Sequence, residues 1–195
     1  MPTIAHVVQA APHYISYGAF LLAEQSAEVK HEWLDGVVYA MAGGSIEHAR
    51  LAGKWIAALT FALGGRCQVY SSDAFLYVQD TKLSTYADAS VTCGSIERHT
   101  VLDKNGKIIG EAITNPAIIV EVLSDSTEKY DRGEKFAHYM RLTSLQEYVL
   151  VNQHRREIEV YRRPEGRGHW LQESYVTGTF SLHGSELTVD SLYAP

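Results

Sequence analysis

The spacing of apolar and polar residues predicts several short β-strands. Residues 32–41 alternate around Asp35-Gly36, a pair that favours a tight turn, and so predict a β-hairpin. Residues 117–123 are short, β-branched and nearly all apolar, which predicts a strand buried on both faces. The other segments with strand character are residues 68–78, 87–93, 148–152 and 158–163, with short β structure after them.

Apolar residues at helical spacing predict three helices. The first begins near Ser16 and ends near Ser26. The second follows Ser45, a suitable N-cap, and Gly64-Gly65 ends it. Its apolar face consists of Leu51, Trp55, Ala58, Leu59 and Ala62. For the third helix, Asp131 and Glu134 resemble a capping box, which predicts a helix from Asp131 to about Leu142.

The remaining segments are connections. We expect residues 1–13 to be loosely ordered, residues 94–110 to form a loop or a hairpin around Asn105-Gly106, and Pro164-Glu165-Gly166 to form a turn. Because helices and strands are interspersed, the order predicts an α/β (α+β) fold with a mixed central sheet flanked by helices and with additional β-hairpins.

Length and composition agree with one globular domain over residues 1–195. The chain has 195 residues, of which 46 % are hydrophobic and 21 % charged. No apolar run is long enough to span a bilayer, and the first residues lack the pattern of a secretory signal, so we expect no membrane association and a cytoplasmic protein. Cys67 and Cys93 are too few for a disulfide framework, and we expect both to be reduced and buried.

The charge is distributed unevenly. The net charge of −6 argues against strong attraction of the whole surface to DNA. Residues 129–167 nevertheless carry nine Lys and Arg against six Asp and Glu. This excess fits a nucleic-acid-binding face and fits an ordinary solvated surface equally well.

Two acids in apolar strands are the main chemical signal. Glu121 interrupts the buried strand at 117–123, and Asp88 precedes the apolar run from Ala89 to Val91. A buried carboxylate is costly unless it is paired, hydrogen-bonded or bound to a metal. Two such acids on neighbouring strands could share a hard cation such as Mg²⁺. The alternatives are an acid paired with an arginine and an acid at a strand end in water.

Several motifs in order resemble one known family. Residues 86–91 (YADASV), 115–124 (NPAIIVEVLS) and 130–136 (YDRGEKF) resemble the Uma-type restriction endonuclease family of the PD-(D/E)XK nuclease superfamily. The motifs at 31–36 (HEWLDG), 147–151 (EYVLV) and 160–163 (VYRR) fit as well, so the resemblance covers roughly residues 16 to 193. It implies a restriction-endonuclease-like fold.

The resemblance also implies roles for particular residues. Asp88 matches the acid of the PD half-motif and Glu121 the central acid. Both would bind Mg²⁺ (or Mn²⁺), with the backbone carbonyl of Val122 as a third ligand. The implied partner is DNA, and a homodimer is expected because nucleases of this superfamily often dimerise to cut both strands.

The chain departs from the superfamily pattern at two positions. Ala87 stands where the proline of the PD half-motif would be, and Leu123 stands where the lysine would be. A lysine from the following helix is the usual substitute in this family, and Lys135 fits that position. The alternative for Lys135 is a solvent-exposed helix lysine.

Five further residues are weaker candidates for the site. Glu32 resembles an extra upstream acid of the superfamily, or is a hairpin charge. His48 could approach the site or a phosphate, or could be structural, and Asp73 could join the acids or cap a bulge. Lys129 and Arg132 are candidates for nucleic-acid binding.

The leading functional hypothesis is a divalent-metal-dependent DNA endonuclease that hydrolyses phosphodiester bonds. The first alternative is a catalytically inactive nuclease-fold protein that binds nucleic acid or another protein. A third is a metal-dependent hydrolase of a small phosphorylated substrate. The sequence has no P-loop and no G-x-S-x-G motif, and without H-E-x-x-H or Cys-x-x-Cys it predicts no zinc site.

Overall fold

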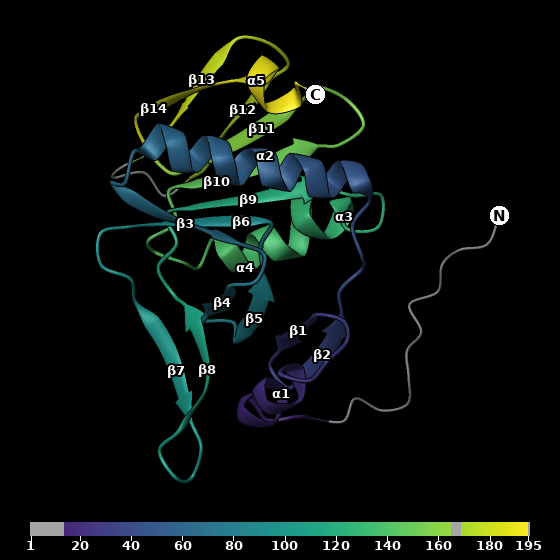
Figure 1. Ribbon diagram of the computed structural model, residues 1–195, viewed down its shortest axis with the longest axis vertical. Coiled ribbons are helices and arrows are strands. Elements are labelled where there is room, and N and C mark those ends of the chain that lie inside the picture. The colour runs from purple at the N-terminus through teal and green to yellow at the C-terminus, as the bar shows by residue number, and fades with distance from the viewer. Residues whose placement is uncertain (1–13, 165–168, 195) are drawn as a thin grey trace, which may run out of the picture.

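A computed structural model describes residues 14–164 and 169–194, and Figure 1 shows how its elements are arranged. The helical elements are α1 (Tyr17–Glu24), α2 (Ile46–Leu63), α3 (Glu128–Tyr130), the π-helical turn η1 (Asp131–Lys135), α4 (Phe136–Tyr139) and α5 (Val189–Tyr193). The strands up to the middle of the chain are β1 (His31–Leu34), β2 (Val37–Ala40), β3 (Cys67–Ser71), β4 (Phe75–Val78), β5 (Leu83–Tyr86), β6 (Ala89–Cys93) and β7 (Arg98–Leu102). The later strands are β8 (Ile108–Ile113), β9 (Ile118–Leu123), β10 (Glu147–Asn152), β11 (Ile158–Arg162), β12 (Leu171–Tyr175), β13 (Thr179–Leu182) and β14 (Ser185–Thr188).

The central sheet is mixed and has the strand order β12-β11-β10-β9-β6-β3. Strands β9 and β10 run parallel, whereas the other neighbours in this sheet are antiparallel. Every residue of β9 and β10 is buried, because helices cover this part of the sheet on both faces. The expected strand with two buried faces is therefore confirmed, and with it the expected mixed sheet flanked by helices.

Helix α2 covers one face of the central sheet (Figure 1). It begins with Ser45, whose side chain accepts a hydrogen bond from the His48 amide, and ends at Gly64 in the left-handed conformation, as expected. Leu51, Trp55 and Leu59 are completely buried against the sheet and against the C-terminal hairpin β13–β14. Complete burial of three such side chains contributes several kcal/mol by the usual transfer free energies of about 1.5–3 kcal/mol each.

The opposite face packs on the helical segment 128–139 and on a second sheet. That sheet has the order β2-β1-β5-β4-β8-β7, with β4 and β8 parallel. Leu76 and Leu83 from the second sheet share one apolar core with Ile119 of the central sheet and with Phe136 and Tyr139 of α4. This shared core places the helical segment beside Glu121.

Most hairpins follow the sequence expectation. Strands β1 and β2 pair around Asp35 and Gly36, which both have positive φ as the tight turn requires. Of the two alternatives for residues 94–110, the hairpin is correct, since β7 and β8 pair antiparallel. The expected N-terminal disorder at 1–13 and most of the turn at Pro164-Glu165-Gly166 lie outside the described residues.

Four elements differ from the sequence expectation. The single strand expected at 68–78 is two strands, β3 and β4, which belong to different sheets because a turn around Asp73 redirects the chain. Strand β5 was not expected, nor was helix α5 within the short β structure predicted at the end of the chain. Asp131 is not an N-cap: the helical segment already begins at Glu128, and Asp131 lies inside it with helical backbone angles.

The expectation of reduced, buried cysteines is also wrong. Cys67 and Cys93 form a disulfide, and both are only partly buried. They lie directly opposite each other in the antiparallel pair β3–β6, a position from which the two side chains meet. Disulfides are rare in cytosolic proteins, so the cysteines give no support to the cytoplasmic expectation.

Among the described helices, none is both long and apolar enough to cross a membrane.

Candidate functional site

A cavity of about 590 Å³ opens where helix α2 passes the start of strand β6. Asp88 and Glu121 line it together with His48. The wall also contains small and apolar residues from the segments before and within α2 and the loop before β6, among them Met41, Ala42, Gly43, Gly44, Ala49, Ala52, Ile56 and Ala87. The two acids that stood out in the sequence therefore face one shared space.

Asp88 occupies a bend just before β6, next to strand β9. Its Oδ2 accepts a hydrogen bond of 2.7 Å from the amide of Val122, the residue that follows Glu121. Within the described residues, its Oδ1 accepts no hydrogen bond. Asp88 is thus fixed through one oxygen, and the other oxygen is free for a ligand.

Glu121 lies in the middle of β9 and is almost fully buried. Its Oε1 accepts a hydrogen bond of 2.9 Å from the Tyr139 hydroxyl and lies 3.0 Å from Nζ of Lys135. Burial raises the pKa of Glu121 well above its usual range, and Asp131 and Asp88 add to this rise, whereas Lys135 opposes it. An additional cation near Glu121 would stabilise the ionised form of its carboxylate.

The second oxygen of Glu121 is accessible from the cavity. It has no hydrogen-bond partner among the described residues. The only buried side-chain polar atoms without a partner in that part of the chain are Trp55 Nε1 and Thr81 Oγ1, so this oxygen keeps some exposed surface. Asp88 and Glu121 consequently each present one unpaired oxygen, the hard ligand that Mg²⁺ and Mn²⁺ prefer.

Lys135 connects Glu121 to two further acids. Its ammonium lies 3.4 Å from Glu32 and 3.7 Å from Asp131, and it donates a hydrogen bond of 3.1 Å to the carbonyl of Tyr86. Burial alone lowers the pKa of Lys135, but the carboxylates of Glu121, Glu32 and Asp131 outweigh burial and hold the pKa well above its usual range. Lys135 is therefore a charged, buried lysine and not the solvent-exposed one of the alternative.

The helical segment positions Lys135 through a π-turn. Asp131, Lys135 and Tyr139 follow one another at intervals of four residues and all three are buried. Residues four apart share a helix face, so this face points at the central sheet. π-Turns are rare and often occur at functional sites. The D-x-x-x-K-x-x-x-Y spacing was the signal that could have revealed Asp131 and Tyr139 from the sequence.

Glu32 enters the site from the hairpin β1–β2. It is 7 % exposed and accepts hydrogen bonds from the hydroxyls of Thr85 and Tyr130, the latter at 2.9 Å. Its position beside Lys135 rules out the alternative of a solvated hairpin charge. The carboxylates of Glu32, Asp88 and Glu121 do not gather within 4.8 Å of one another among the described residues. A cation held by Asp88 and Glu121 would thus need the Val122 carbonyl or water to complete its coordination shell. Glu32 would not bind the cation and would remain the partner of Lys135.

His48 approaches the site from the first turn of α2. Its Nε2 lies 3.2 Å from Oδ2 of Asp88. The hydrogen bond to Asp88 raises the pKa of His48, and this effect exceeds the opposing effect of burial. Of the two alternatives for His48, the structure supports the one in which it lies at the acids.

Three other candidates lie away from the acids. Asp73 is 83 % exposed and pairs with Lys30 at 2.6 Å. Arg132 makes a bidentate contact with Glu159 and bonds Glu128, so its guanidinium is already occupied. Lys129 is exposed within α3. Lys30, which the sequence did not suggest, lines the cavity.

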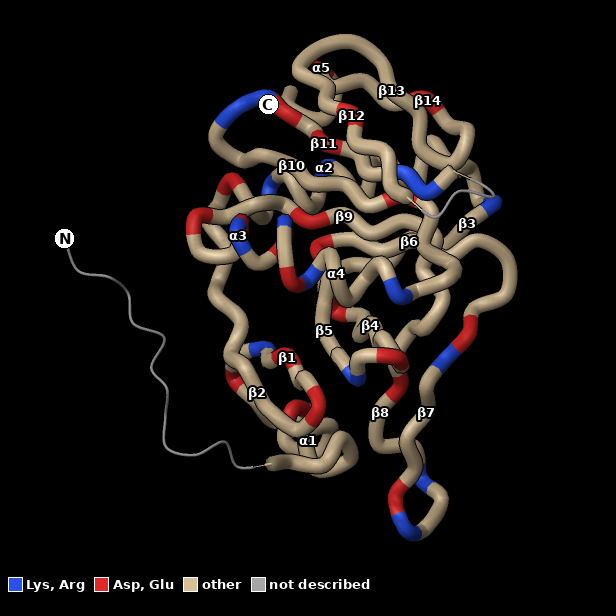
Figure 2. Tube along the Cα trace, turned by 180° about the vertical axis from the view of Figure 1, so that it is seen from behind, with Lys and Arg blue, Asp and Glu red and all other residues tan. Residues whose placement is uncertain are grey.

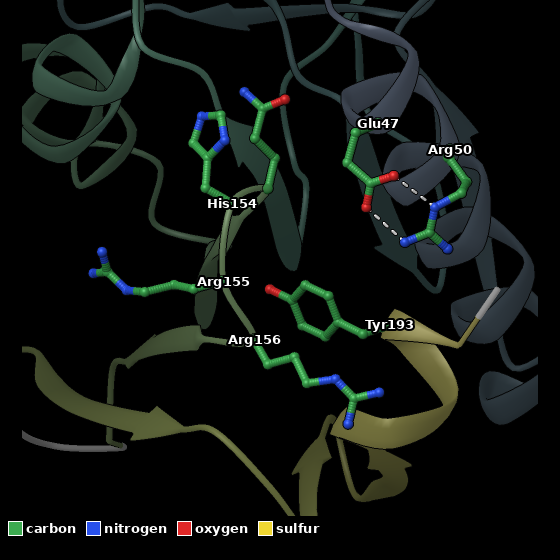
Figure 3. Close-up of a pocket in the computed structure, with 7 residues that line it drawn as sticks. Glu47, Arg50, His154, Arg155, Arg156 and Tyr193 are labelled. Atoms are coloured by element: carbon green, nitrogen blue, oxygen red, sulfur yellow. Dashed lines mark hydrogen bonds and ion pairs between the residues drawn. The ribbon is translucent and has the colours of Figure 1, made fainter.

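A smaller hollow of about 210 Å³ lies on the other side of the α2 N-terminus (Figure 3). The turn between β10 and β11 forms one wall of it and carries a histidine and two arginines, but each is paired. His154 binds Asp125, Arg155 binds Glu157, and Arg156 binds Asp190. On the facing helix, Arg50 binds Glu47, which is the pair joined by dashed lines in Figure 3.

The basic excess of residues 129–167 does not form a continuous positive face in the described part. Figure 2 shows acidic and basic positions interleaved along the trace. Arg162 pairs with Glu147 and Glu173, and Arg163 donates to the carbonyls of Met140 and Leu142. The structure therefore favours the solvated-surface alternative for most of this segment.

Comparisons with known proteins identify the family. A crystal structure from Anabaena variabilis, described as a putative nuclease belonging to DUF820, superposes with a TM-score of 0.66 at 15 % identity, over 86 % of this chain and 92 % of that one. At this identity the match shows a shared fold. An uncharacterized protein of Synechocystis sp. is 36 % identical over 88 % of this chain and 86 % of its own length. A second one is 30 % identical over 85 % and 89 %. The family model Uma2, described as "Putative restriction endonuclease", matches residues 18–192, and the chain belongs to the Uma2 family.

Proposed function

We propose that this chain is a divalent-metal-dependent DNA endonuclease that hydrolyses phosphodiester bonds. The observation that carries the proposal is the pair Asp88 and Glu121, each with one unpaired oxygen on the same cavity. The family description and the nuclease-like fold support the same reaction class.

The donor set fits Mg²⁺ or Mn²⁺. Asp88 and Glu121, whose hard oxygens face one cavity, would hold the ion, with the Val122 carbonyl as the third ligand that the family resemblance implies. Glu32, Asp131 and Glu121 with Lys135 leave a formal charge of −2, and ionised Asp88 makes it −3. Such a surplus of negative charge attracts a divalent cation. When bound, the ion supplies an activated water and offsets negative charge on the phosphoryl group.

The side chains around the acids have distinct tasks in this proposal. Lys135 favours the ionised form of Glu121 and supplies positive charge toward the phosphoryl oxygens, the task of the strand lysine whose place Leu123 takes. Tyr139 fixes the orientation of the Glu121 carboxylate through its hydroxyl. His48 holds Asp88 and, when protonated, is placed to contact a phosphate oxygen at the cavity mouth. Cleavage of both strands would further require two copies of the chain.

The test is cleavage of labelled single- and double-stranded DNA by purified protein with Mg²⁺, Mn²⁺, Ca²⁺ or chelator. We expect Asp88→Asn and Glu121→Gln to lose at least about 100-fold in rate with the fold retained, because loss of an outer partner of a metal site already costs about 10–100-fold. Asp190→Asn is the matched control: the same change at an exposed acid that does not line the cavity should leave the rate unchanged.

A second candidate is a nuclease-fold protein that binds nucleic acid or protein without cutting. The leucine at position 123, where the superfamily has its lysine, favours it. Calorimetric titration with Mn²⁺ separates the two. Binding of one ion that depends on Asp88 and Glu121, together with cleavage, supports the enzyme. DNA binding without metal binding or cleavage supports the second candidate.

A further inference from the structure

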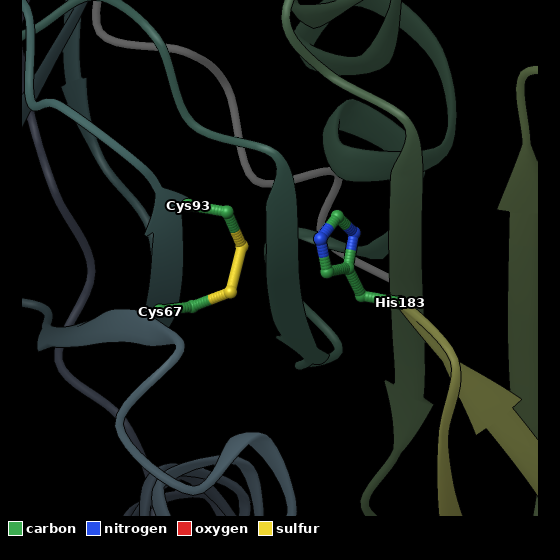
Figure 4. A group of neighbouring side chains, drawn as sticks. All are labelled: Cys67, Cys93 and His183. Atoms are coloured by element: carbon green, nitrogen blue, oxygen red, sulfur yellow. A yellow bond between two sulfur atoms is a disulfide. The ribbon is translucent and has the colours of Figure 1, made fainter.

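A group of possible metal ligands lies far from the acids, at the edge of the central sheet. Cys67, Cys93 and His183 bring their sulfur and ring nitrogen atoms within 4.8 Å of one another. Figure 4 shows the imidazole of His183 turned toward the two sulfurs. It is the one such group of three or more His, Cys, Asp or Glu side chains among residues 14–164 and 169–194.

The two cysteines can change state without moving their strands. Cys67 begins β3 and Cys93 ends β6, and the two are directly opposite in the ladder. Opening the disulfide requires the sulfurs to separate to roughly 3.7 Å in order to share a tetrahedral zinc ion, given Zn–S bonds of about 2.3 Å. Rotation of the two cysteine side chains is enough to separate the sulfurs by this distance. The backbones of β3 and β6 can therefore stay paired in their ladder.

His183 is held in place independently of the cysteines. It lies in the turn between β13 and β14 with φ 47°, and its amide donates a hydrogen bond of 2.8 Å to Glu147. The same turn is fixed to the end of α2, because Ser185 donates to the carbonyl of Ala62 and accepts from Arg66. No described residue hydrogen-bonds either ring nitrogen of His183, so the imidazole is available as a ligand.

We propose that the reduced protein binds a zinc ion through Cys67, Cys93 and His183. Two thiolates and one imidazole are ligands that suit Zn²⁺, and water would fill the fourth position. A disulfide needs only the two cysteines. The third group, delivered by a turn some 90 residues later in the chain, is what distinguishes a metal site from a simple cross-link.

Zinc binding requires that a dithiol first reduce the Cys67–Cys93 disulfide. The dithiol transfers two electrons and two protons to the Cys67–Cys93 bond and becomes a cyclic disulfide, which leaves two protein thiols. Each thiol then loses its proton to solvent as its sulfur binds Zn²⁺. The oxidised protein has no thiolate and does not bind zinc here. In either state the two cysteines link β3 to β6 at the edge of the central sheet, but only the metal also fastens the β13–β14 turn to this edge.

No sequence pattern indicated this site, since Cys67 and Cys93 are 26 residues apart and lack a Cys-x-x-Cys spacing. Its ligands also differ in kind from those of Asp88 and Glu121. Soft thiolates select Zn²⁺, whereas carboxylates suit Mg²⁺ and Mn²⁺. The proposal is therefore independent of the nuclease function.

The experiment uses the full chain, reduced with dithiothreitol and desalted without oxygen, or left oxidised. Zn²⁺ affinity is measured by competition with a chromophoric chelator, and Co²⁺ is used to record the thiolate-to-cobalt charge-transfer band. We expect the reduced chain to bind one ion more than the oxidised chain, with the charge-transfer band only in the reduced chain. Cys67→Ser with Cys93→Ser should abolish this difference and the band, and Asp88→Asn should leave the band unchanged.

His183→Asn tests the third ligand, because asparagine tolerates the positive φ at this turn. We expect the affinity to fall by about tenfold or more. His154→Asn, the same change at an exposed histidine, is the matched control. The proposal is overturned if the reduced, folded wild type binds no more zinc than the oxidised protein, if the disulfide resists the dithiol in the folded protein, or if His183→Asn binds as the wild type does.

Discussion

The ammonium of Lys135 lies 3.0 Å from Oε1 of Glu121, and both side chains are at most 5 % exposed. The same ammonium is within 4 Å of Glu32 and Asp131, so one buried cation serves three buried carboxylates. Removing two partners of opposite charge from water is costly, and the cost is recovered only while both remain. Lys135 is consequently a structural as well as a chemical element of the site.

We predict that Lys135→Met lowers the free energy of unfolding by about 3–5 kcal/mol near neutral pH, because the carboxylates lose their counter-ion. Burial raises the pKa of Glu121 and of Asp131, so both protonate more readily in the folded than in the unfolded state. The deficit should therefore shrink as the pH falls toward 5. Urea titrations at both pH values measure it.

The matched control for this prediction is Lys129→Met, on the exposed side of the helical segment, which should change stability by less than about 0.5 kcal/mol. We also expect Lys135→Met to reduce DNA cleavage far more than DNA affinity. Equal stability of the two methionine variants would contradict the buried ion cluster.

The contact between His48 and Asp88 predicts a pH dependence. The pKa of His48 is raised above 6.5 because Asp88 accepts its hydrogen bond. Stability from this pair is fully present below the unfolded pKa and is lost as the pH rises through the folded one. Asp88→Asn should therefore destabilise the metal-free protein more at pH 6 than at pH 9.

Nuclear magnetic resonance of the His48 ring protons measures the pKa directly. It should fall in Asp88→Asn. It should also fall in the wild type with saturating Mg²⁺, since a cation at Asp88 repels the imidazolium. A His48 pKa that does not respond to Mg²⁺ would count against a metal at Asp88.

Gly44 and Gly43 offer a matched pair for testing how His48 is positioned. A Cβ on Gly44 would lie 2.8 Å from Nδ1 of His48, whereas a Cβ on Gly43 would meet nothing within 4 Å. We predict that Gly44→Ala displaces the imidazole, lowers its pKa and reduces cleavage, at a cost of about 0.5–1.5 kcal/mol for the changed rotamer. Gly43→Ala should behave as the wild type, and equal effects of both substitutions would show that His48 tolerates the change.

Arg132 is predicted to act in stability and not in DNA binding. Its guanidinium contacts both oxygens of Glu159 at 2.6 and 2.9 Å, and Glu159 is largely buried. Arg132→Gln should lower stability by about 1–3 kcal/mol, because Oε1 of Glu159 loses its donor while Oε2 keeps Tyr161 and Gln172. It should leave DNA affinity unchanged in a fluorescence anisotropy titration. A clear loss of affinity in the folded variant would restore Arg132 to the nucleic-acid face.

The sequence alone determined those elements whose signals are local. The cap at Ser45, the stop at Gly64 and the turn at Asp35-Gly36 each depend on a few neighbouring residues, and all three were predictable. The apolar run at 117–123 likewise revealed a doubly covered strand, because burial on both faces removes the alternation of polar residues. Within it, the misfit of Glu121 marked the candidate site.

Only the tertiary structure decided which distant residues meet. Glu32, Glu121 and Lys135 come from a hairpin, a central strand and a π-turn, and no local spacing relates them. The Cys67–Cys93 disulfide depends on the register between β3 and β6 in the same way. The start of the third helix was misjudged at Asp131 because a typical capping pattern was outweighed by burial against Lys135. Local free energies of capping and turn formation are about 1 kcal/mol, whereas the contacts of a buried charge are worth several, so packing prevails where the two conflict.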